Sequence, residues 1–320
     1  MPDNTRGRIV VVGSLNADLT VRTTRLPRPG ETVTGSDLTI APGGKGSNQA
    51  AAAALLGADA ALVGHVGDDH YGAFLLDRAQ AAGIDTSRVT TLDGTSTGTA
   101  VIAVDESGEN SIIVSPGANA RLTADDVTAA ADAFGGAAVL CLCFEIAIDT
   151  VRAAAALASA AGLQVVLNPS PYAVVDRDLL GLTDLLVVNQ HELAAMLTIP
   201  AAGPGDTDWS RVIGALTGRG PHHVVVTFGA SGAVVLDLTA DDREPVMVSS
   251  PAVHAVDTTG CGDAFLGSLA ARIALGDEPV RASEYAVVVG AFAATRAGAQ
   301  SSYPTAAELD EFQVAVGRSG

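Results

Sequence analysis

The sequence predicts an α/β fold with a mostly parallel central sheet and a small, separate β sheet. Short apolar runs, such as residues 9–12 and 139–143, alternate with helix-forming segments along most of the 320 residues. This alternation is typical of βαβ units, in which helices cover both faces of a parallel sheet. Two other regions consist of short alternating segments broken by proline and glycine, which predicts hairpin strands outside the main sheet.

The elements follow from these patterns in chain order. We expect buried strands at 9–12, 60–66, 139–143, 165–167, 185–188 and 224–227, with helices beginning near Lys45, Gly72, Ile148 and Glu192. The small sheet is expected from segments at about 19–40 and 88–114, including strands at 31–34 and 88–92. Such a sheet could form a lid that excludes water from a ligand site. We predict one domain, residues 1–320.

Composition and charge exclude several classes of partner. Hydrophobic residues make up 48% of the chain, which is typical of a well-buried globular protein. The net charge is −18, which argues against a nucleic acid or an anionic membrane as partner. The first apolar run is too short for a signal sequence or spanning helix, so we expect a cytoplasmic protein. The three cysteines indicate neither a disulfide framework nor a zinc site.

A glycine-rich turn at residues 256–265 precedes a strongly helical segment. Gly260 and Gly262 leave the backbone N–H groups from Gly260 to Asp263 unobstructed at a helix N-terminus, which is a common anion-binding arrangement. Asp257 and Asp263 could instead be helix caps. Because a cap requires one such residue and no glycines, the pattern favours a phosphate site with Asp263 as a neighbouring acid or base.

Lys45 is the only lysine in the chain and lies in the glycine-rich segment 42–48. Arginine supplies every other basic residue, so this position favours a compact positive charge, with chance placement as the alternative. The segment is not a Walker A loop, because Thr39 stands where that motif begins with glycine and Gly46 follows the lysine. No motif of a serine hydrolase or a zincin is present either.

Polar side chains follow the predicted parallel strands at their carboxyl ends, the edge at which open α/β sheets bind ligands. Asn16 and Asp18 follow the first strand, and their spacing points both side chains in one direction. An Asx turn explains this pair equally well. The residues after later strands are Glu145, Asn168, Asn189 with Glu192, and Thr227 with Gly229 and Gly232.

In their order and spacing, these fragments resemble the ribokinase branch of the PfkB carbohydrate kinase family over nearly the whole chain. The motifs that carry the resemblance are residues 13–18, 42–50, 64–72, 168–169, 189–192, 227–232, 257–263 and 295–300. Each is weak alone, whereas their combination is specific. The resemblance implies a three-layer α/β/α sandwich with a β-sheet lid.

The resemblance also implies roles for matching residues. Asp263 would take the proton from the sugar hydroxyl as it attacks the γ-phosphate of ATP. The N–H groups of Gly260, Cys261, Gly262 and Asp263 would stabilise the transferred group. The implied sugar-binding residues are Ser14, Asn16, Asp18, Gly43, Gly44, Lys45, Asn48, Glu145 and Asp263. The implied nucleotide set is Asn189 and Glu192, which would order Mg²⁺ and its waters, with Thr227, Gly229, Gly232, Gly262 and Val287.

A site for K⁺ is implied as well, partly through backbone carbonyls. Its positions correspond to Asp257, Thr259, Ala293, Arg296, Gly298 and Ser302. Two residues depart from the family pattern. Cys261 stands where Ala, Gly or Ser is usual, and a helix N-terminus there could lower the pKa of its thiol. Val287 replaces a polar residue of some relatives, so contacts with the base would be mainly apolar.

The resemblance therefore implies an ATP-dependent kinase that phosphorylates the 5-hydroxyl of D-ribose to give ribose 5-phosphate and ADP. One alternative is a related kinase for a ketohexose, deoxyribose or a nucleoside. The 4% aromatic content argues against the nucleoside. The other alternative is a non-catalytic sugar or nucleotide sensor. Exposed edges of the lid strands could pair with a second subunit, so we expect a homodimer.

Overall fold

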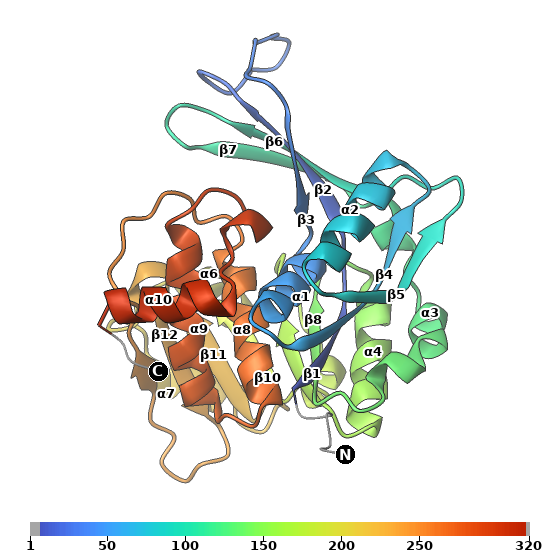
Figure 1. Cartoon of the computed structure of the whole chain (residues 1–320). Helices are drawn as coiled ribbons and strands as arrows, with labels where there is room; N and C mark the ends of the chain where they lie inside the picture. The colour runs from blue at the N-terminus through green and yellow to red at the C-terminus, as the bar shows by residue number, and fades with distance from the viewer. Residues whose placement is uncertain (1–6, 318–320) are drawn as a thin grey trace.

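The computed structural model describes residues 7–317 and contains two β sheets (Figure 1). The nine-stranded sheet has the order β13-β12-β11-β10-β9-β8-β1-β4-β5, parallel from β11 to β5 and antiparallel at β12 and β13. The predicted mostly parallel sheet is thus confirmed. Its strands are β1 (Arg8–Val12), β4 (Asp59–Gly67), β5 (Asp85–Leu92), β8 (Val139–Cys143), β9 (Gln164–Asn168), β10 (Leu185–Asn189), β11 (His223–Thr227), β12 (Ala233–Asp237) and β13 (Val246–Val248).

Helices cover both faces of this sheet, because its strands carry apolar side chains on both sides. In β1, Ile9 and Val11 face one core, whereas Val10 and Val12 face the other. The first core is covered by α1 (Lys45–Leu55), α2 (His70–Ala81), α8 (Cys261–Ala274), α9 (Pro279–Ala294) and α10 (Ala306–Ala315). The second is covered by α3 (Ala124–Ala129), α4 (Ile148–Ala160), α5 (Arg177–Gly181), α6 (Gln190–Leu197) and α7 (Trp209–Leu216).

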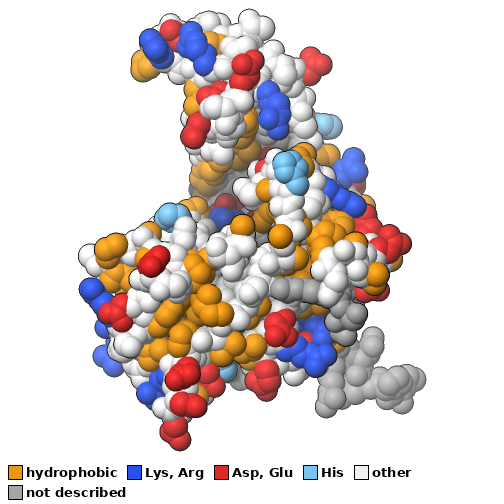
Figure 2. Space-filling view, turned by 90° about the vertical axis from the view of Figure 1, so that its left-hand side faces the viewer, with side chains coloured by type: hydrophobic (Ala, Val, Ile, Leu, Met, Phe, Trp, Pro, Cys, Tyr) orange, Lys and Arg blue, Asp and Glu red, His pale blue; other side chains and the backbone are white. Residues whose placement is uncertain are grey.

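The four-stranded sheet rises from the body (Figure 1) and has the order β3-β2-β6-β7. Its strands are β2 (Asn16–Arg22), β3 (Thr39–Gly43), β6 (Gly98–Val104) and β7 (Asn110–Ser115). The space-filling view shows it as a narrow projection from the body (Figure 2). The predicted lid strand at 31–34 is wrong, because residues 29–38 form no strand in the structure.

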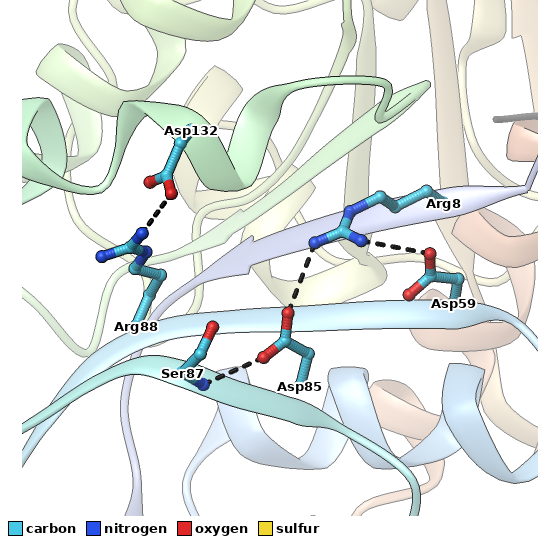
Figure 3. A network of polar contacts seen from close by, with 6 residues as sticks. All are labelled: Arg8, Asp59, Asp85, Ser87, Arg88 and Asp132. Carbon is cyan, nitrogen blue, oxygen red and sulfur yellow. Dashed lines mark hydrogen bonds and ion pairs between the residues drawn. The ribbon is translucent and has the colours of Figure 1, made fainter.

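The predicted lid strand at residues 88–92 is also wrong. These residues belong to β5, which pairs in parallel with β4 at the edge of the main sheet. Figure 3 shows the polar contacts that hold this edge. Arg8 donates to Asp59 at 3.2 Å and to Asp85 at 3.4 Å, while Arg88 forms an ion pair with Asp132. Polar and apolar residues alternate in any half-exposed strand. The sequence pattern therefore could not decide which of the two sheets contains β5.

Close packing of α1 against α8 brings residues distant in sequence to the candidate site. An added Cβ at Gly267 of α8 would lie 2.2 Å from the carbonyl oxygen of Gln49 and 2.9 Å from Cβ of Ala52. Small residues on both helices therefore permit an approach that larger side chains would prevent. As a result, the first turns of the two helices lie side by side.

Two further features of composition have structural counterparts. Cys141 and Cys143 are buried in β8 as free thiols, and Cys261 is also free, in agreement with the absence of a predicted disulfide framework. Between residues 7 and 317, none of the helices combines the length and apolarity required to span a membrane.

Candidate active site

Asp263 lies in the first turn of α8 and is 7% exposed. Gly260 adopts the left-handed conformation, with φ of 72°, and ends the preceding turn so that the helix begins at Cys261. Asn48 Nδ2 donates to one carboxylate oxygen of Asp263 at 2.9 Å, and Gln49 Nε2 donates to the other at 3.3 Å. Asp263 is thus held by two amides of α1 and is not a simple helix cap.

The backbone N–H groups at the start of α8 differ from the predicted set in one member. Cys261 N–H donates to the carbonyl of Thr258 at 3.2 Å. The N–H groups of Gly260, Gly262 and Asp263 have no hydrogen-bond partner within the described part of the chain. Gly262 is exposed, so these free donors can meet an anion beside the buried Asp263 carboxylate.

The expectation of an acidic thiol at Cys261 is wrong. Burial, with the negative charges of Asp257 and Asp263, raises the pKa of the Cys261 thiol to about 11. Burial and these two carboxylates outweigh the effect of the helix N-terminus on the thiol. Cys261 is therefore a protonated thiol at neutral pH.

Glu145 follows β8 and joins the segment between β1 and β2 to the start of α1. Its Oε2 accepts from Ser14 Oγ at 2.6 Å, from the Lys45 backbone N–H at 2.9 Å and from Asn16 Nδ2 at 3.5 Å. Gly44 precedes this junction with φ of 89°, and an added Cβ there would lie 2.7 Å from the Asn16 nitrogen. The structure therefore brings these predicted sugar-binding residues together at the carboxyl edge of the sheet.

Asp18 and Lys45 give this edge its charge pattern. Burial, with the negative charges of Glu145 and Asp263, raises the pKa of Asp18 from 3.8 to about 7. Burial alone would lower the pKa of Lys45, but the carboxylates of Asp263 and Glu145 outweigh it and raise the value. Lys45 therefore stays protonated, and its positive charge offsets the negative charges of Asp263 and Glu145. Gly43 leaves room for Asp18, since an added Cβ would lie 2.2 Å from its carboxylate oxygen.

Asn189 and Glu192 form a capping box at the start of α6. Asn189 Oδ1 accepts from the Glu192 N–H at 2.9 Å, and Glu192 Oε2 accepts from the Asn189 N–H at 2.9 Å. Glu192 Oε1 has no hydrogen bond to residues 7–317. One carboxylate oxygen is therefore available to a water of a hydrated Mg²⁺ ion. No three His, Cys, Asp or Glu side chains among the described residues are grouped as metal ligands.

The remaining predicted nucleotide residues lie at the end of β11, in and after the turn that follows it, and on α9. Thr227 ends β11, Gly229 begins the 3₁₀ turn η3 (Gly229–Ser231) that follows it, and Gly232 comes directly after that turn. Gly232 has φ of 91°, and an added Cβ would lie 2.0 Å from the carbonyl oxygen of Val248. Val287 is 5% exposed and belongs to the first core, so it offers little surface to a base.

The predicted cation-binding residues come from two segments that the structure joins. Asp257 Oδ2 accepts from the Gly298 N–H at 2.9 Å, and Asp257 Oδ1 accepts from the N–H and hydroxyl of Thr259. The Arg296 side chain points elsewhere, because it pairs with Glu308 at 2.9 Å. Arg296 could therefore bind a cation only through its backbone carbonyl. The Ala293 carbonyl and the Ser302 hydroxyl are the other candidate ligands, and this hydroxyl donates to the Ala299 carbonyl at 2.7 Å. These oxygens fit the chemistry of a hard monovalent ion.

Residue patterns did not assign a role to four side chains that the structure places here. Asn119 donates to Asn16 Oδ1 at 2.8 Å and accepts from the Leu15 N–H at 3.0 Å. It belongs to an isolated 3₁₀ turn, η1 (Gly117–Arg121), with no motif to mark it. Gln49 and Gln300 lie inside the motifs quoted above, which was the available signal. Tyr303 Oη donates to the Gly260 carbonyl at 3.0 Å, and nothing in its sequence context indicated this.

The fold and the geometry together define a class of protein, an α/β phosphotransferase with a buried carboxylate beside free N–H groups at a helix N-terminus. A model of the pfkB family of carbohydrate kinases matches residues 6–306. The chain therefore belongs to the pfkB family of carbohydrate kinases.

Several relatives are similar to the chain over nearly its whole length. It is 33% identical to the ribokinase of Haemophilus influenzae over 307 residues, which cover 96% of this chain and 98% of that protein. It is 34% identical to the deoxyribokinase of Salmonella typhi over 307 residues, which cover 95% and 98%. The ribokinase of Arabidopsis thaliana, solved with ribose and ATP, superposes with a TM-score of 0.86 at 28% identity and covers 96% and 98%.

Proposed function

We propose that this protein is an ATP-dependent ribokinase, which transfers the γ-phosphate of ATP to the 5-hydroxyl of D-ribose and releases ribose 5-phosphate and ADP. The observation that carries the proposal is Asp263, a buried carboxylate held by two amides beside free N–H groups at the start of α8. A kinase requires a proton acceptor and an anion-binding surface at adjacent positions.

Each part of the site has a distinct task in this proposal. Asp263 accepts the proton of the 5-hydroxyl as that oxygen attacks. The N–H groups of Gly260, Gly262 and Asp263 stabilise the charge on the transferred phosphoryl group. Asp18, Asn16 and Asn48 hold the sugar hydroxyls, and the Lys45 ammonium balances the surrounding acids. The lid sheet excludes water, so ATP is not hydrolysed.

Two ions belong to the proposal. A bound Mg²⁺ ion would supply positive charge that neutralises the phosphates of ATP. Glu192, with its free carboxylate oxygen, and Asn189 would hold that ion through water. K⁺ would be held on the other side of the turn from the phosphoryl group by Asp257, Thr259, the Ser302 hydroxyl and the carbonyls of Ala293, Arg296 and Gly298. Its test is the rate in potassium-free buffer, and a rate equal to that with potassium would exclude the site.

The sugar is assigned from the relatives. Ribose is supported by the curated relatives named ribokinase and by the Arabidopsis enzyme solved with ribose and ATP. 2-Deoxyribose is the second candidate, because the deoxyribokinase of Salmonella typhi is as similar to the chain. These sugars differ by one hydroxyl, so the two activities can be compared directly.

The test is a coupled ADP-release assay with ribose, 2-deoxyribose, fructose and a nucleoside as acceptors. We expect the highest kcat/KM on ribose. In Asp263→Asn, kcat should fall by about 10²–10⁴-fold, the usual effect of losing a general base, while ribose binding measured by calorimetry persists. Binding of ribose without ADP release in the unmodified protein would indicate a sensor. A near-normal kcat in the variant would remove Asp263 as the base.

We further propose a single cytoplasmic domain that forms a homodimer through the lid. Hydrophobic side chains on the lid sheet and its connection are exposed by 40–69%, which is unusual for a monomer surface. These residues are Leu38, Ile40, Val101, Ile112, Ile113 and Val114. Light scattering should give twice the 32.0 kDa chain mass, and Ile113→Lys should restore the monomer mass. A monomeric unmodified protein would exclude this assembly.

A further inference from the structure

Residues 298–303 lie in the connection between α9 and α10 and include the 3₁₀ turn η4 (Gln300–Ser302). This loop contacts the start of α8 and the start of α1, the two elements that build the candidate active site. The backbone N–H of Gly298 donates to Asp257. Two side chains of the loop form further contacts with the site. These two side chains are Gln300 and Tyr303.

Tyr303 supports the turn that opens α8. Its ring is 4% exposed and packs in the first core, and its hydroxyl donates to the Gly260 carbonyl at 3.0 Å. The same carbonyl accepts the first helical hydrogen bond, from the Ala264 N–H at 2.9 Å. Contact is tight, since an added Cβ at Gly260 would lie 2.7 Å from the Tyr303 hydroxyl. Two donors therefore fix the orientation of the Gly260 peptide group.

The Tyr303 hydroxyl is a permanent donor. Burial, with the negative charge of Asp263, raises the pKa of Tyr303 well above its ordinary value of 10. The Gly260 carbonyl shares its peptide plane with the Cys261 N–H. The helical backbone that begins at Cys261 carries this orientation on to the N–H groups of Gly262 and Asp263. Tyr303 thus acts on these N–H groups through the backbone and does not itself face the substrate position.

Gln300 supports the amide that holds Asp263. Its Nε2 donates to Asn48 Oδ1 at 3.0 Å and to Ser47 Oγ at 3.0 Å. With its oxygen occupied in this way, the Asn48 amide presents Nδ2 to Asp263, to which it donates at 2.9 Å. A reversed amide would place two oxygens against each other, which costs free energy. Gln300 therefore selects the orientation of Asn48 in which it holds the Asp263 carboxylate.

We propose that Gln300 and Tyr303 are positioning residues, through which one loop aligns both the Asp263 carboxylate and the phosphoryl-binding N–H groups. The proposal rests on the proposed kinase function and extends it to residues that contact neither reacting group. Displacement of a catalytic group by about 1 Å can cost 10²-fold in rate. A loop that restrains two such groups should therefore affect kcat more than binding.

The experiment compares Tyr303→Phe and Gln300→Leu with two matched controls. Tyr303→Phe keeps the buried ring and removes only the hydroxyl. Its control is Tyr285→Phe on α9, whose ring stacks against Arg272 away from the turn. The control for Gln300→Leu is Gln80→Leu, which removes an amide hydrogen bond of 2.9 Å to Thr86. For each variant, kcat, the KM for ribose and ATP, and the thermal midpoint are measured.

We expect kcat of Tyr303→Phe to fall about tenfold with both KM values changed by less than about twofold. Gln300→Leu should also lose about tenfold in kcat, and its ribose KM should rise because Asn48 is released. Both controls should keep the unmodified kcat. A kcat equal to that of the controls, with only a lower thermal midpoint, would overturn the inference. If the unmodified protein releases no ADP with any sugar, it is the proposed function that fails.

Discussion

Replacement of Asp18 by asparagine should change how stability depends on pH. Burial and two neighbouring carboxylates raise the pKa of Asp18 from 3.8 to about 7 in the folded protein. Between these two values the folded state binds more protons than the unfolded state. The free energy of unfolding therefore decreases as pH rises through that window. The full shift corresponds to about 4 kcal/mol, of which about 2–3 kcal/mol is lost between pH 5 and pH 8.

The assay is urea unfolding of the sugar-free protein at several pH values from 5 to 8. The free energy of unfolding of Asp18→Asn, relative to that of the unmodified protein, should increase by about 2–3 kcal/mol from pH 5 to pH 8. The reason is that the variant has no carboxylate that becomes charged in the folded state. Asp37→Asn is the control, since Asp37 is exposed and precedes the next strand of the same sheet. Parallel pH profiles for the unmodified protein and Asp18→Asn would refute the explanation.

Three further predictions follow from contacts in and near the site. Gly43→Ala places a Cβ 2.2 Å from the Asp18 carboxylate and should raise the ribose KM about tenfold in steady-state assays; an unchanged KM would contradict the steric argument. At pH 8, iodoacetamide should alkylate Cys261 about 100-fold more slowly than a free cysteine, and a comparable rate would contradict its raised pKa. Asp69 accepts hydrogen bonds from the Gly72 N–H and from the N–H and hydroxyl of Thr97. Asp69→Ala should therefore lower the free energy of unfolding, measured with urea, by about 2–3 kcal/mol. A decrease no larger than that caused by Asp68→Ala, at the exposed neighbouring position, would contradict this.

Local pattern predicted the parts of the site that depend on local chemistry. Gly260 and Asp263 were predicted from spacing alone, because a helix N-terminus with bare backbone depends on a few consecutive residues. The sheet edge that gathers Asn16 and Glu145 followed from the alternation of strands and helices. In contrast, the assignment of β5 failed, because its polarity pattern is compatible with either sheet and Arg8, 77 residues away, contacts it only in the folded chain.

The chemistry of Cys261 shows the same limit. A helix N-terminus predicts a lowered thiol pKa, and the pattern contains that helix. The opposing effects, burial and the charges of Asp257 and Asp263, depend on how the turn folds back on itself. A pKa is determined by the sum of such effects, so the sequence indicated one contribution and the fold reversed the result.

By itself, the sequence determined the α/β class, the family resemblance and the identity of the carboxylate at the start of α8, because each of these depends on order and spacing along the chain. Only the tertiary structure decided which donors hold that carboxylate and which N–H groups remain free. Asn48 and Asp263 are 215 residues apart, and Gln300 is 252 residues from Asn48. Contacts at such separations arise from the packing of α1 on α8, which no local pattern specifies.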